Sequence, residues 1–202
     1  MNLSCPAAPL SDACLDQIFR TARSYNGYRD IPVREEQLEE VWDLMKFGPT
    51  SANMLPARLV WCRSTDAKSR LAACASSTNS AKIKAAPVCA IIAMDLDFHE
   101  QLPWLFPHTD ARSWFTSSET LRTESAMRNS SLQGAYFIIA ARSLGLDIGP
   151  MSGFDNVAVD KEFFAKTPNI KTNFIATLGY GDPASIFDRL PRPDFSKFNE
   201  VI

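Results

Sequence analysis

The sequence predicts an α+β (mixed α/β) fold, in which helices and strands interleave along the chain and the helices flank a central sheet. Two observations indicate the helices: segments near the N-terminus carry apolar residues at helical spacing, and a long apolar helix follows later in the chain. A third, a continuous apolar run of strand length, indicates the buried sheet. With 202 residues, 46% of them hydrophobic, we expect a single domain over residues 1–202.

The first part of the chain predicts two amphipathic helices. The first is expected to lie on the core, because it carries apolar residues at i, i+3, i+4 and i+7: Leu15, Ile18, Phe19 and Ala22. The second runs from about Arg34 to Phe47 and ends at Gly48-Pro49, because proline cannot continue a helix.

Three strands follow from composition and length. Arg58 to Arg63 is a short strand, and Asp66 is expected to cap the helix after it. Pro87 to Met94 is apolar throughout, which predicts a central strand covered on both faces. Asn173 to Gly179 is the last strand, and a short helix from about Val157 to Ala165 precedes it.

A long excursion separates the two halves of the pattern. Residues Leu96 to Phe115 are rich in aromatic residues and proline, and a loop of this length in a compact domain is usually functional or a lid. The helix after it runs from about Ser118 to Leu144. Because its second half is apolar almost all round, we expect that half to be buried.

Several classes of protein are disfavoured by composition. The 21 basic and 23 acidic residues are well mixed, which argues against nucleic-acid binding. The apolar runs are too short to span a membrane, and the first residues do not resemble a signal peptide, so a cytoplasmic location is expected. Five cysteines without a CxxC pair, and two histidines without zinc-ligand spacing, predict neither disulfides nor a metal site.

Familiar catalytic motifs are also missing. No G-x-G-x-x-G follows a strand, and there is no phosphate-binding P-loop. The stretch Gly149 to Gly153 has the spacing G-x-x-S-G, one residue too long for a serine nucleophile elbow, and a hydrolase would need His99 or His108 as its base.

Three polar clusters stand where the periodic pattern breaks: Arg23-Ser24-Tyr25-Asn26, Gly48 to Asn53, and Pro150 to Phe154. Each alone has an ordinary structural interpretation. An arginine at a helix C-terminus complements the helix dipole, and Pro-Thr-Ser-Ala-Asn is common turn composition.

Together and in this order, the clusters resemble those of the nitroreductase family of FMN-dependent oxidoreductases, over nearly the whole chain. The segments GPTSAN, FPHTDARSWF, RNSSLQGAY, GPMSGFD and GYGDP are most similar to a subgroup that contains reductases of malonic semialdehyde. The resemblance implies a nitroreductase-like sheet, a homodimer, bound FMN, and NADH or NADPH as co-substrate.

The resemblance also assigns the phosphate end of the cofactor site. Arg23 and Ser24 would hold the FMN phosphate and ribityl chain, and Arg192 would lie near the phosphate. Asn26 stands where the family usually has a basic residue. Arginine suits this role, because its guanidinium can bind a phosphate dianion through two hydrogen bonds.

The flavin ring is assigned to three further segments. One matches a loop that reaches the flavin from the other subunit: Pro49, Thr50, Ser51 and Asn53. Asn79 and Lys82 match a pair at the pyrimidine edge, where a cation stabilises the reduced ring. A third segment matches one whose backbone amides face the flavin N5 and O4: Met151, Ser152 and Gly153. The ring carries the electron chemistry, so no catalytic side chain is expected.

The acceptor is left open by the sequence. Malonic semialdehyde, reduced to 3-hydroxypropanoate, is implied by the subgroup, whereas nitroaromatics or quinones would use the same pocket. Arg112 is a candidate ligand for a substrate carboxylate, with Trp114 and Phe115 excluding water. The alternative is that Arg112 holds the excursion through an ion pair with Asp110 or another acid. A non-enzymatic flavin-binding protein and a plain interaction module are the other classes.

Overall fold

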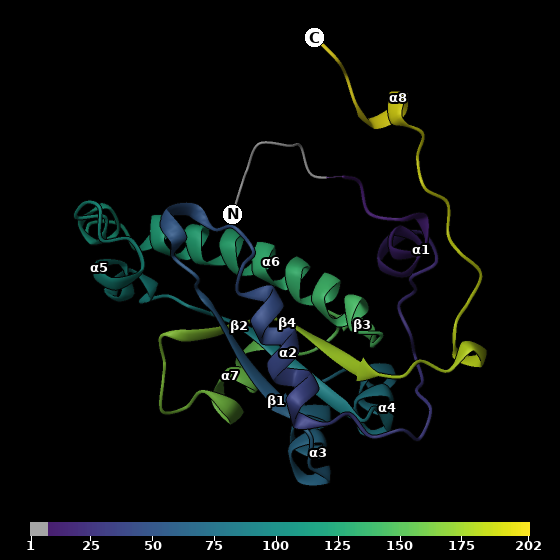
Figure 1. Ribbon diagram of the computed structural model, residues 1–202. Helices are drawn as coiled ribbons and strands as arrows, with labels where there is room; N and C mark the ends of the chain where they lie inside the picture. Colours follow the sequence, from purple (N-terminus) through teal and green to yellow (C-terminus); the bar gives the residue numbers. More distant parts are fainter. Residues whose placement is uncertain (1–7) are drawn as a thin grey trace.

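A four-stranded antiparallel sheet organises residues 8–202, the part of the chain that the computed structural model describes (Figure 1). The strands lie in the order β1-β2-β4-β3. Their bounds are β1 Ala57–Cys62, β2 Val88–Asp95, β3 Asp147–Met151 and β4 Ile170–Gly179. The three predicted strands are confirmed. The sequence does not predict β3, because Gly149 and Pro150 interrupt its apolar pattern.

The prediction of a central strand covered on both faces is confirmed by β2, whose eight residues are all buried. Val88, Ala90 and Ile92 share a core cluster with residues of α2 (Glu35–Met45) and α6 (Glu119–Ser143). The alternate residues of β2 join a cluster with the helices of the opposite face: α3 Thr65–Ala73, α4 Ser77–Ala85 and α7 Asn156–Phe163. Burying an isoleucine or valine side chain contributes about 1.5–3 kcal/mol, so β2 anchors the fold.

Helix α6 runs along the sheet and is the longest helix of the described chain (Figure 1). The Ser118 hydroxyl caps it by accepting from the N–H of Leu121 at 3.2 Å, and Gly145 ends it with φ +75°. The expectation that its second half is buried all round is wrong. Leu132 is 46% exposed and Tyr136 38% exposed, so one face of α6 is open in the single chain.

The first predicted helix differs from expectation. It is a short helix α1, Asp12–Leu15, followed by a π-helical turn, Asp16–Arg20, and neither contains a buried residue. The predicted core contact is wrong, because the segment lies at the periphery (Figure 1) and Phe19 is 53% exposed.

The cap of α3 is also corrected. The Ser64 hydroxyl accepts from the N–H of Ala67 at 3.1 Å, so Ser64 and not Asp66 is the N-cap. Asp66 lies in the first turn, where a carboxylate favours the helix dipole.

The excursion between β2 and α6 contains three short helical turns: Phe98–Gln101, α5 Leu102–Leu105 and Arg112–Phe115. Four of its apolar residues, Phe98, Leu102, Ala111 and Phe115, form a third cluster. The other members of this cluster come from outside the excursion: Met54, Met94 and Ala126. The excursion is therefore packed onto the end of the sheet and α6.

The chain ends in an extended arm that leaves the body after residue 185 and carries one turn, α8 Phe195–Phe198 (Figure 1). Its apolar side chains are exposed: Phe187, Leu190, Phe195, Phe198, Val201 and Ile202.

Within residues 8–202, no helix combines the length and the hydropathy needed to cross a membrane. The cysteines of this part of the chain are free: Cys14, Cys62, Cys74 and Cys89. Cys5 lies outside the described residues.

Candidate functional site

A pocket of about 420 Å³ lies between the first polar cluster, the end of α6 and the base of the C-terminal arm. We call it the arginine pocket. Its lining is Ala22, Arg23, Ser24, Asn26, Arg142, Phe187, Asp188, Arg189, Leu190 and Arg192. The structure therefore brings together the four residues that the sequence assigned to the phosphate end, and adds Arg142 and Arg189. Four arginines face one carboxylate, so the pocket favours an anion.

Hydrogen bonds to backbone carbonyls hold this pocket together. Arg23 donates to the carbonyl of Phe187, and Arg189 donates to the carbonyl of Ala22 at 2.9 Å. Asn26 Nδ2 donates to the carbonyl of Ser185 at 3.0 Å. Because these acceptors are neutral, the arginines keep their full positive charge toward the pocket.

The arginine pocket lies beside the outer edge of β3. Ser24 forms a parallel bridge with Ile148, and the Tyr25 N–H donates to the Ile148 carbonyl at 3.2 Å. Glycine is required at position 149, because a Cβ there would lie 2.5 Å from the carbonyl oxygen of Tyr25. This close backbone approach fixes the first polar cluster against the sheet.

A second hollow, of about 380 Å³, lies at the other end of β3, against α6 and β4. We call it the edge groove. Its lining is Ser131, Gly134, Ala135, Ile138, Pro150, Met151, Ser152, Asn173 and Phe174. It includes two of the three residues predicted to face a flavin ring, Met151 and Ser152.

The third such residue, Gly153, connects the edge groove to α4. Asn79 Nδ2 donates to the Gly153 carbonyl at 3.1 Å, and a Cβ at Gly153 would lie 2.7 Å from that nitrogen. Lys82 lies one helical turn after Asn79 on α4. The N–H groups of Ser152 and Gly153 form no hydrogen bond within residues 8–202, so both donors are free for a ligand.

The Pro49 to Asn53 loop is held elsewhere, by the N-terminal half of α6. Asn129, 1% exposed, accepts from the Ser51 N–H at 2.8 Å, and Asn53 Nδ2 donates to the Leu105 carbonyl at 2.8 Å. Three non-glycine residues in this loop or just after it have positive φ: Ala52 at 47°, Asn53 at 49° and Leu55 at 38°. Such strain persists only where the surroundings enforce it, and it concentrates at functional loops.

The loop and the arginine pocket are far apart within one chain. Asn129 and Arg142 mark their positions on α6. These residues are 13 positions apart, or about 20 Å at the helical rise per residue.

Comparison with known proteins decides the family. The profile of the nitroreductase family matches residues 19–180. The chain belongs to the nitroreductase family. A protein of Stenotrophomonas maltophilia, provisionally named NADH dehydrogenase/NAD(P)H nitroreductase, is 58% identical over 93% of this chain and 95% of its own length. A Burkholderia lata protein with the same provisional name is 58% identical over 95% of this chain and 98% of its own.

Solved structures share the nitroreductase fold. A provisionally named nitroreductase from Bacillus subtilis superposes with a TM-score of 0.83 at 20% identity, covering 94% of this chain and 99% of that one. One from Exiguobacterium sibiricum, solved in complex with FMN, gives a TM-score of 0.81 at 17% identity, covering 98% and 100%. The family resemblance and the fold class expected from the sequence are therefore confirmed.

The residues present fit the phosphate and ring of FMN. An arginine-lined pocket at one end of β3 suits a dianion, and free N–H donors beside a glycine at the other end suit the polar edge of a ring. Arg142, which also lines the arginine pocket, is incompletely satisfied, because its buried Nε has no hydrogen-bond partner within residues 8–202.

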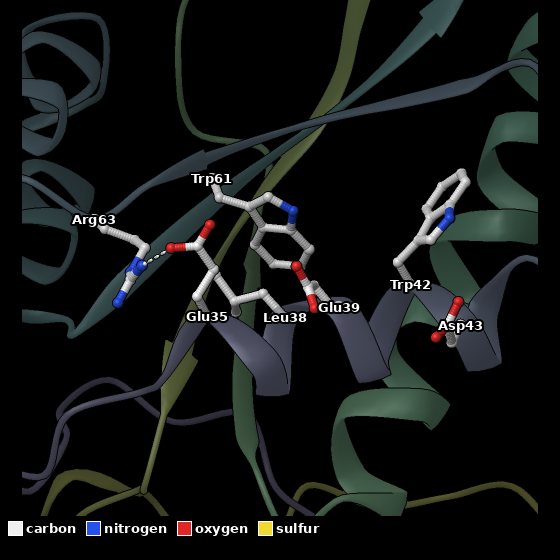
Figure 2. A pocket seen from close by; sticks show the side chains of 7 residues that line it. All are labelled: Glu35, Leu38, Glu39, Trp42, Asp43, Trp61 and Arg63. Atoms are coloured by element: carbon white, nitrogen blue, oxygen red, sulfur yellow. Dashed lines mark hydrogen bonds and ion pairs between the residues drawn. The ribbon is translucent and has the colours of Figure 1, made fainter.

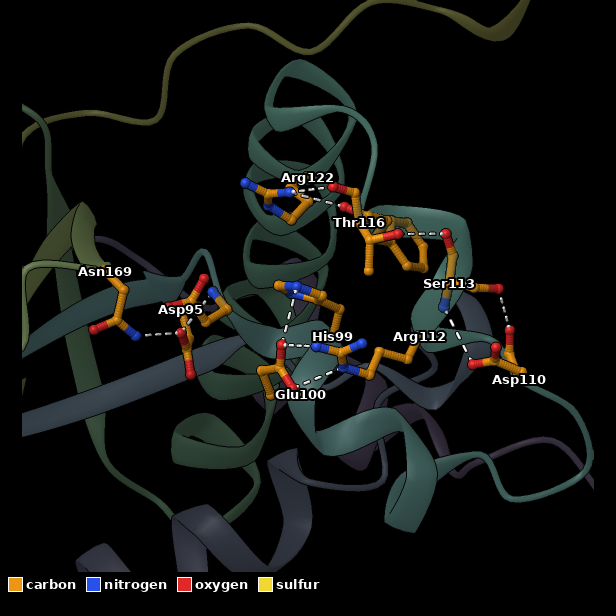
Figure 3. A network of polar contacts seen from close by, with 11 residues as sticks. Asp95, His99, Glu100, Asp110, Arg112, Ser113, Thr116, Arg122 and Asn169 are labelled. Carbon is orange, nitrogen blue, oxygen red and sulfur yellow. Dashed lines mark hydrogen bonds and ion pairs between the residues drawn. The ribbon is translucent and has the colours of Figure 1, made fainter.

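The excursion of this nitroreductase shows how Arg112 is used (Figure 3). Arg112 forms a bidentate ion pair with Glu100, from Nε to Oε2 at 2.8 Å and from Nη2 to Oε1 at 2.7 Å. Arg112 thereby lowers the pKa of the Glu100 carboxyl from its ordinary value. The partner is Glu100 and not Asp110, whose carboxylate instead accepts from the Ser113 N–H at 3.3 Å.

The two aromatic candidates of the excursion have different surroundings. Phe115 is buried in the third cluster, with its ring edge-on to Phe98 at 5.0 Å between centroids. Trp114 is 50% exposed and lies 6.3 Å from Phe106. Of the two, Trp114 is exposed to solvent, whereas Phe115 packs the excursion onto the core.

A third hollow, of about 540 Å³, lies between α2 and β1 (Figure 2) and has the opposite charge. Its lining is Glu35, Leu38, Glu39, Trp42, Asp43, Trp61 and Arg63. Arg63 is paired with Glu35 at 2.9 Å, so the net charge is negative. This acidic groove therefore does not suit a phosphate, in contrast to the arginine pocket.

Three residues of these sites are not predicted from the sequence: Arg142, Arg189 and Asn129. Arg142 carried a signal, because it is an arginine within an otherwise apolar helical segment. Asn129 lies in the RNSSLQGAY segment, but its contact with a loop 78 residues earlier has no local signature.

Proposed function

We propose that this nitroreductase is an FMN-dependent oxidoreductase that oxidises NAD(P)H and reduces a small acceptor. The observation that carries the proposal is the pair of sites along the edge of β3, with the arginine pocket at one end and the edge groove at the other. Five strand residues span about 17 Å, so the two ends suit one elongated ligand with an anionic tail and a planar head.

At the tail, Arg23 and Arg192 would bind the phosphate, with Ser24 beside it. Arginine is suited to this task, since two parallel N–H donors match two phosphate oxygens. The carbonyl contacts of Arg23 and Asn26 would set the orientation of the pocket before the cofactor arrives.

At the head, the N–H groups of Ser152 and Gly153 would donate to the polar edge of the ring. Bound FMN supplies a carrier that accepts a hydride from NAD(P)H and delivers it to the acceptor in a second, ping-pong half-reaction. Lys82 would stabilise negative charge on the pyrimidine side. Asn79 would orient the segment by its bond to the Gly153 carbonyl.

We further propose that the site is completed in a homodimer. The family resemblance assigns the Pro49 to Asn53 loop to the flavin of the other subunit, and within this chain the loop lies about 20 Å along α6 from the arginine pocket. Exposed apolar side chains on α6, Met127, Leu132 and Tyr136, together with those of the C-terminal arm, supply surface for that contact. Sedimentation should give a flavin-loaded dimer, and a stable flavin-loaded monomer would contradict this part.

The acceptor side of the site is apolar, with Pro150, Met151 and Phe174 in the edge groove. This lining favours a planar, uncharged acceptor such as a quinone or nitroaromatic. Reduction of malonic semialdehyde is the narrower candidate, supported by the likeness of GPMSGFD and GYGDP to that subgroup. Its carboxylate would need a cation, and the Arg112 guanidinium is already paired with Glu100.

The test is an absorption spectrum of the purified protein, followed by NADH and NADPH oxidation with malonic semialdehyde, a quinone and a nitroaromatic in parallel. We expect a yellow protein that turns over at least one acceptor. A yellow protein without turnover would indicate a non-enzymatic flavin-binding protein. A colourless protein that takes up no added FMN would contradict the proposal and favour an interaction module.

A further inference from the structure

Arg142 is the one arginine of the arginine pocket that comes from the long helix. It lies in the last turn of α6, beside the buried Ala140 and Ala141, and is itself half-buried. Burying a cation is costly unless it is paired, so a half-buried arginine here needs an explanation.

The contacts of Arg142 satisfy only part of its guanidinium. Nη1 donates to the Ile18 carbonyl at 3.1 Å, while Nε is buried and has no partner within residues 8–202. The Asp147 carboxyl lies near enough to favour the charged form of Arg142, and its Oδ2 accepts from the Gly181 N–H at 2.8 Å. The guanidinium is therefore held in place with bonding capacity left over.

The neutral residue at position 26 supplies the second part of the argument. The family resemblance places a basic residue there, whereas Asn26 is uncharged and its Nδ2 is used by the Ser185 carbonyl. A pocket for a dianion at this site lacks one positive charge from the first polar cluster. Arg142 lines the same pocket as Asn26 and comes from a different element.

We propose that Arg142 supplies this missing charge, as a ligand of the cofactor phosphate that makes the site select FMN over unphosphorylated riboflavin. The inference rests on the proposed function, because it assumes that the anion bound here is the FMN phosphate. Burial lowers the pKa of the Arg142 guanidinium, Asp147 raises it and Arg189 lowers it, and a phosphate dianion would act in the same direction as Asp147.

The test compares Arg142→Gln with Arg128→Gln, a control that removes an exposed arginine of the same helix. Dissociation constants for FMN and for riboflavin are measured on the apoprotein by quenching of flavin fluorescence. We expect Arg142→Gln to weaken FMN about 10- to 100-fold, the range for a lost charged hydrogen bond, with riboflavin affinity changed less than about twofold. Arg128→Gln should leave both unchanged.

The outcomes separate the two claims. If the wild-type protein binds neither flavin, the proposed function fails. If it binds FMN and Arg142→Gln binds FMN equally well, or loses both flavins in proportion, Arg142 is structural and the inference is overturned. If Arg142→Gln does not fold, Arg142→Met decides, because it also removes the charge but keeps an unbranched apolar stem in the half-buried site. Weaker FMN binding with unchanged riboflavin binding supports the role, and unchanged binding of both contradicts it.

Discussion

The C-terminal end and the middle of α6 make different kinds of contact. The C-terminal end, at Arg142, gathers guanidinium groups that bond only to neutral carbonyls and so keep their charge for a ligand. The middle of the helix uses neutral amides: Asn129 accepts from the Ser51 N–H and Gln133 from the Ala57 N–H, both at 2.8 Å. The C-terminal end is arranged to attract an anion, whereas the middle of the helix fixes the backbone of the Pro49 to Asn53 loop and of β1.

This difference bears on the proposed homodimer. The arginine pocket and the edge groove share the β3 edge, whereas the fixed loop is bound by Asn129, 13 positions before Arg142 on the helix. In the proposed homodimer, two-fold symmetry would bring the loop of each copy to the site of the other.

The strongest test of the charged end is Arg23→Glu. Replacing a cation with an anion removes a bidentate contact and adds repulsion, so FMN affinity should fall about 100-fold or more, corresponding to about 3 kcal/mol. Equilibrium titration with FMN measures the effect. Lys84→Glu makes the same charge change on an exposed site of α4 and should leave FMN affinity within about twofold. Equal losses in both variants would mean that net charge alone, and not this pocket, holds the cofactor.

The edge groove lies between the two ends of α6 and depends on backbone donors. Ser152→Ala should be nearly silent, because the contact is made by the N–H. Ser152→Pro removes that donor and should slow flavin reduction by NADH about 5- to 100-fold, the range for a lost hydrogen bond of about 1–3 kcal/mol. Stopped-flow absorbance follows the reduction. If alanine slows the reaction as much as proline, the hydroxyl is the functional group.

The elements of the fold and the residues of the site could not be predicted equally well from the sequence. Helix α2 and strand β2 follow from residues with a clear period or a continuous apolar run, such as Val41 and Ile91, and the structure confirms them. Helix α4 is missed, because only Ile83 among its nine residues is buried and its first turn is Ser-Thr-Asn. The polar clusters were found as breaks in the pattern, and family resemblance, not periodicity, gave them roles.

The partners of the site residues could not be predicted, and the reason is physical. Arg23 contacts Phe187 and Arg189 contacts Ala22, each more than 160 positions away. No local preference encodes such pairs, because they exist only when the arm returns to the start of the chain. The same holds for Asn129 and the loop it fixes.

The role of the two amide side chains of α6 is tested by comparing Asn129→Ala with Gln133→Ala. Each change leaves one backbone N–H without its acceptor, and we expect each to lower the free energy of unfolding by about 1–3 kcal/mol. Only Asn129→Ala should speed hydrogen exchange at residues 50–55 and reduce turnover, since Gln133 holds β1 and not the loop. If both variants lower turnover equally, general destabilisation explains the loss and the loop has no special role.

The smallest effect is expected for the ion pair of the excursion. Because Arg112 lowers the pKa of Glu100, the stabilisation by this pair is present at neutral pH and is lost as acidic pH protonates the carboxyl. The two side chains are 43% and 47% exposed, so Arg112→Ala and Glu100→Gln should each change the melting temperature only slightly.

We expect the ratio of catalytic efficiencies (kcat/KM) for malonic semialdehyde and a quinone to stay the same in both variants, since Arg112 serves as scaffold. Steady-state kinetics with the two acceptors measure that ratio. A selective loss of malonic semialdehyde reduction in Arg112→Ala, with a selective gain in Glu100→Gln as the guanidinium is released, would instead make Arg112 the ligand of the substrate carboxylate.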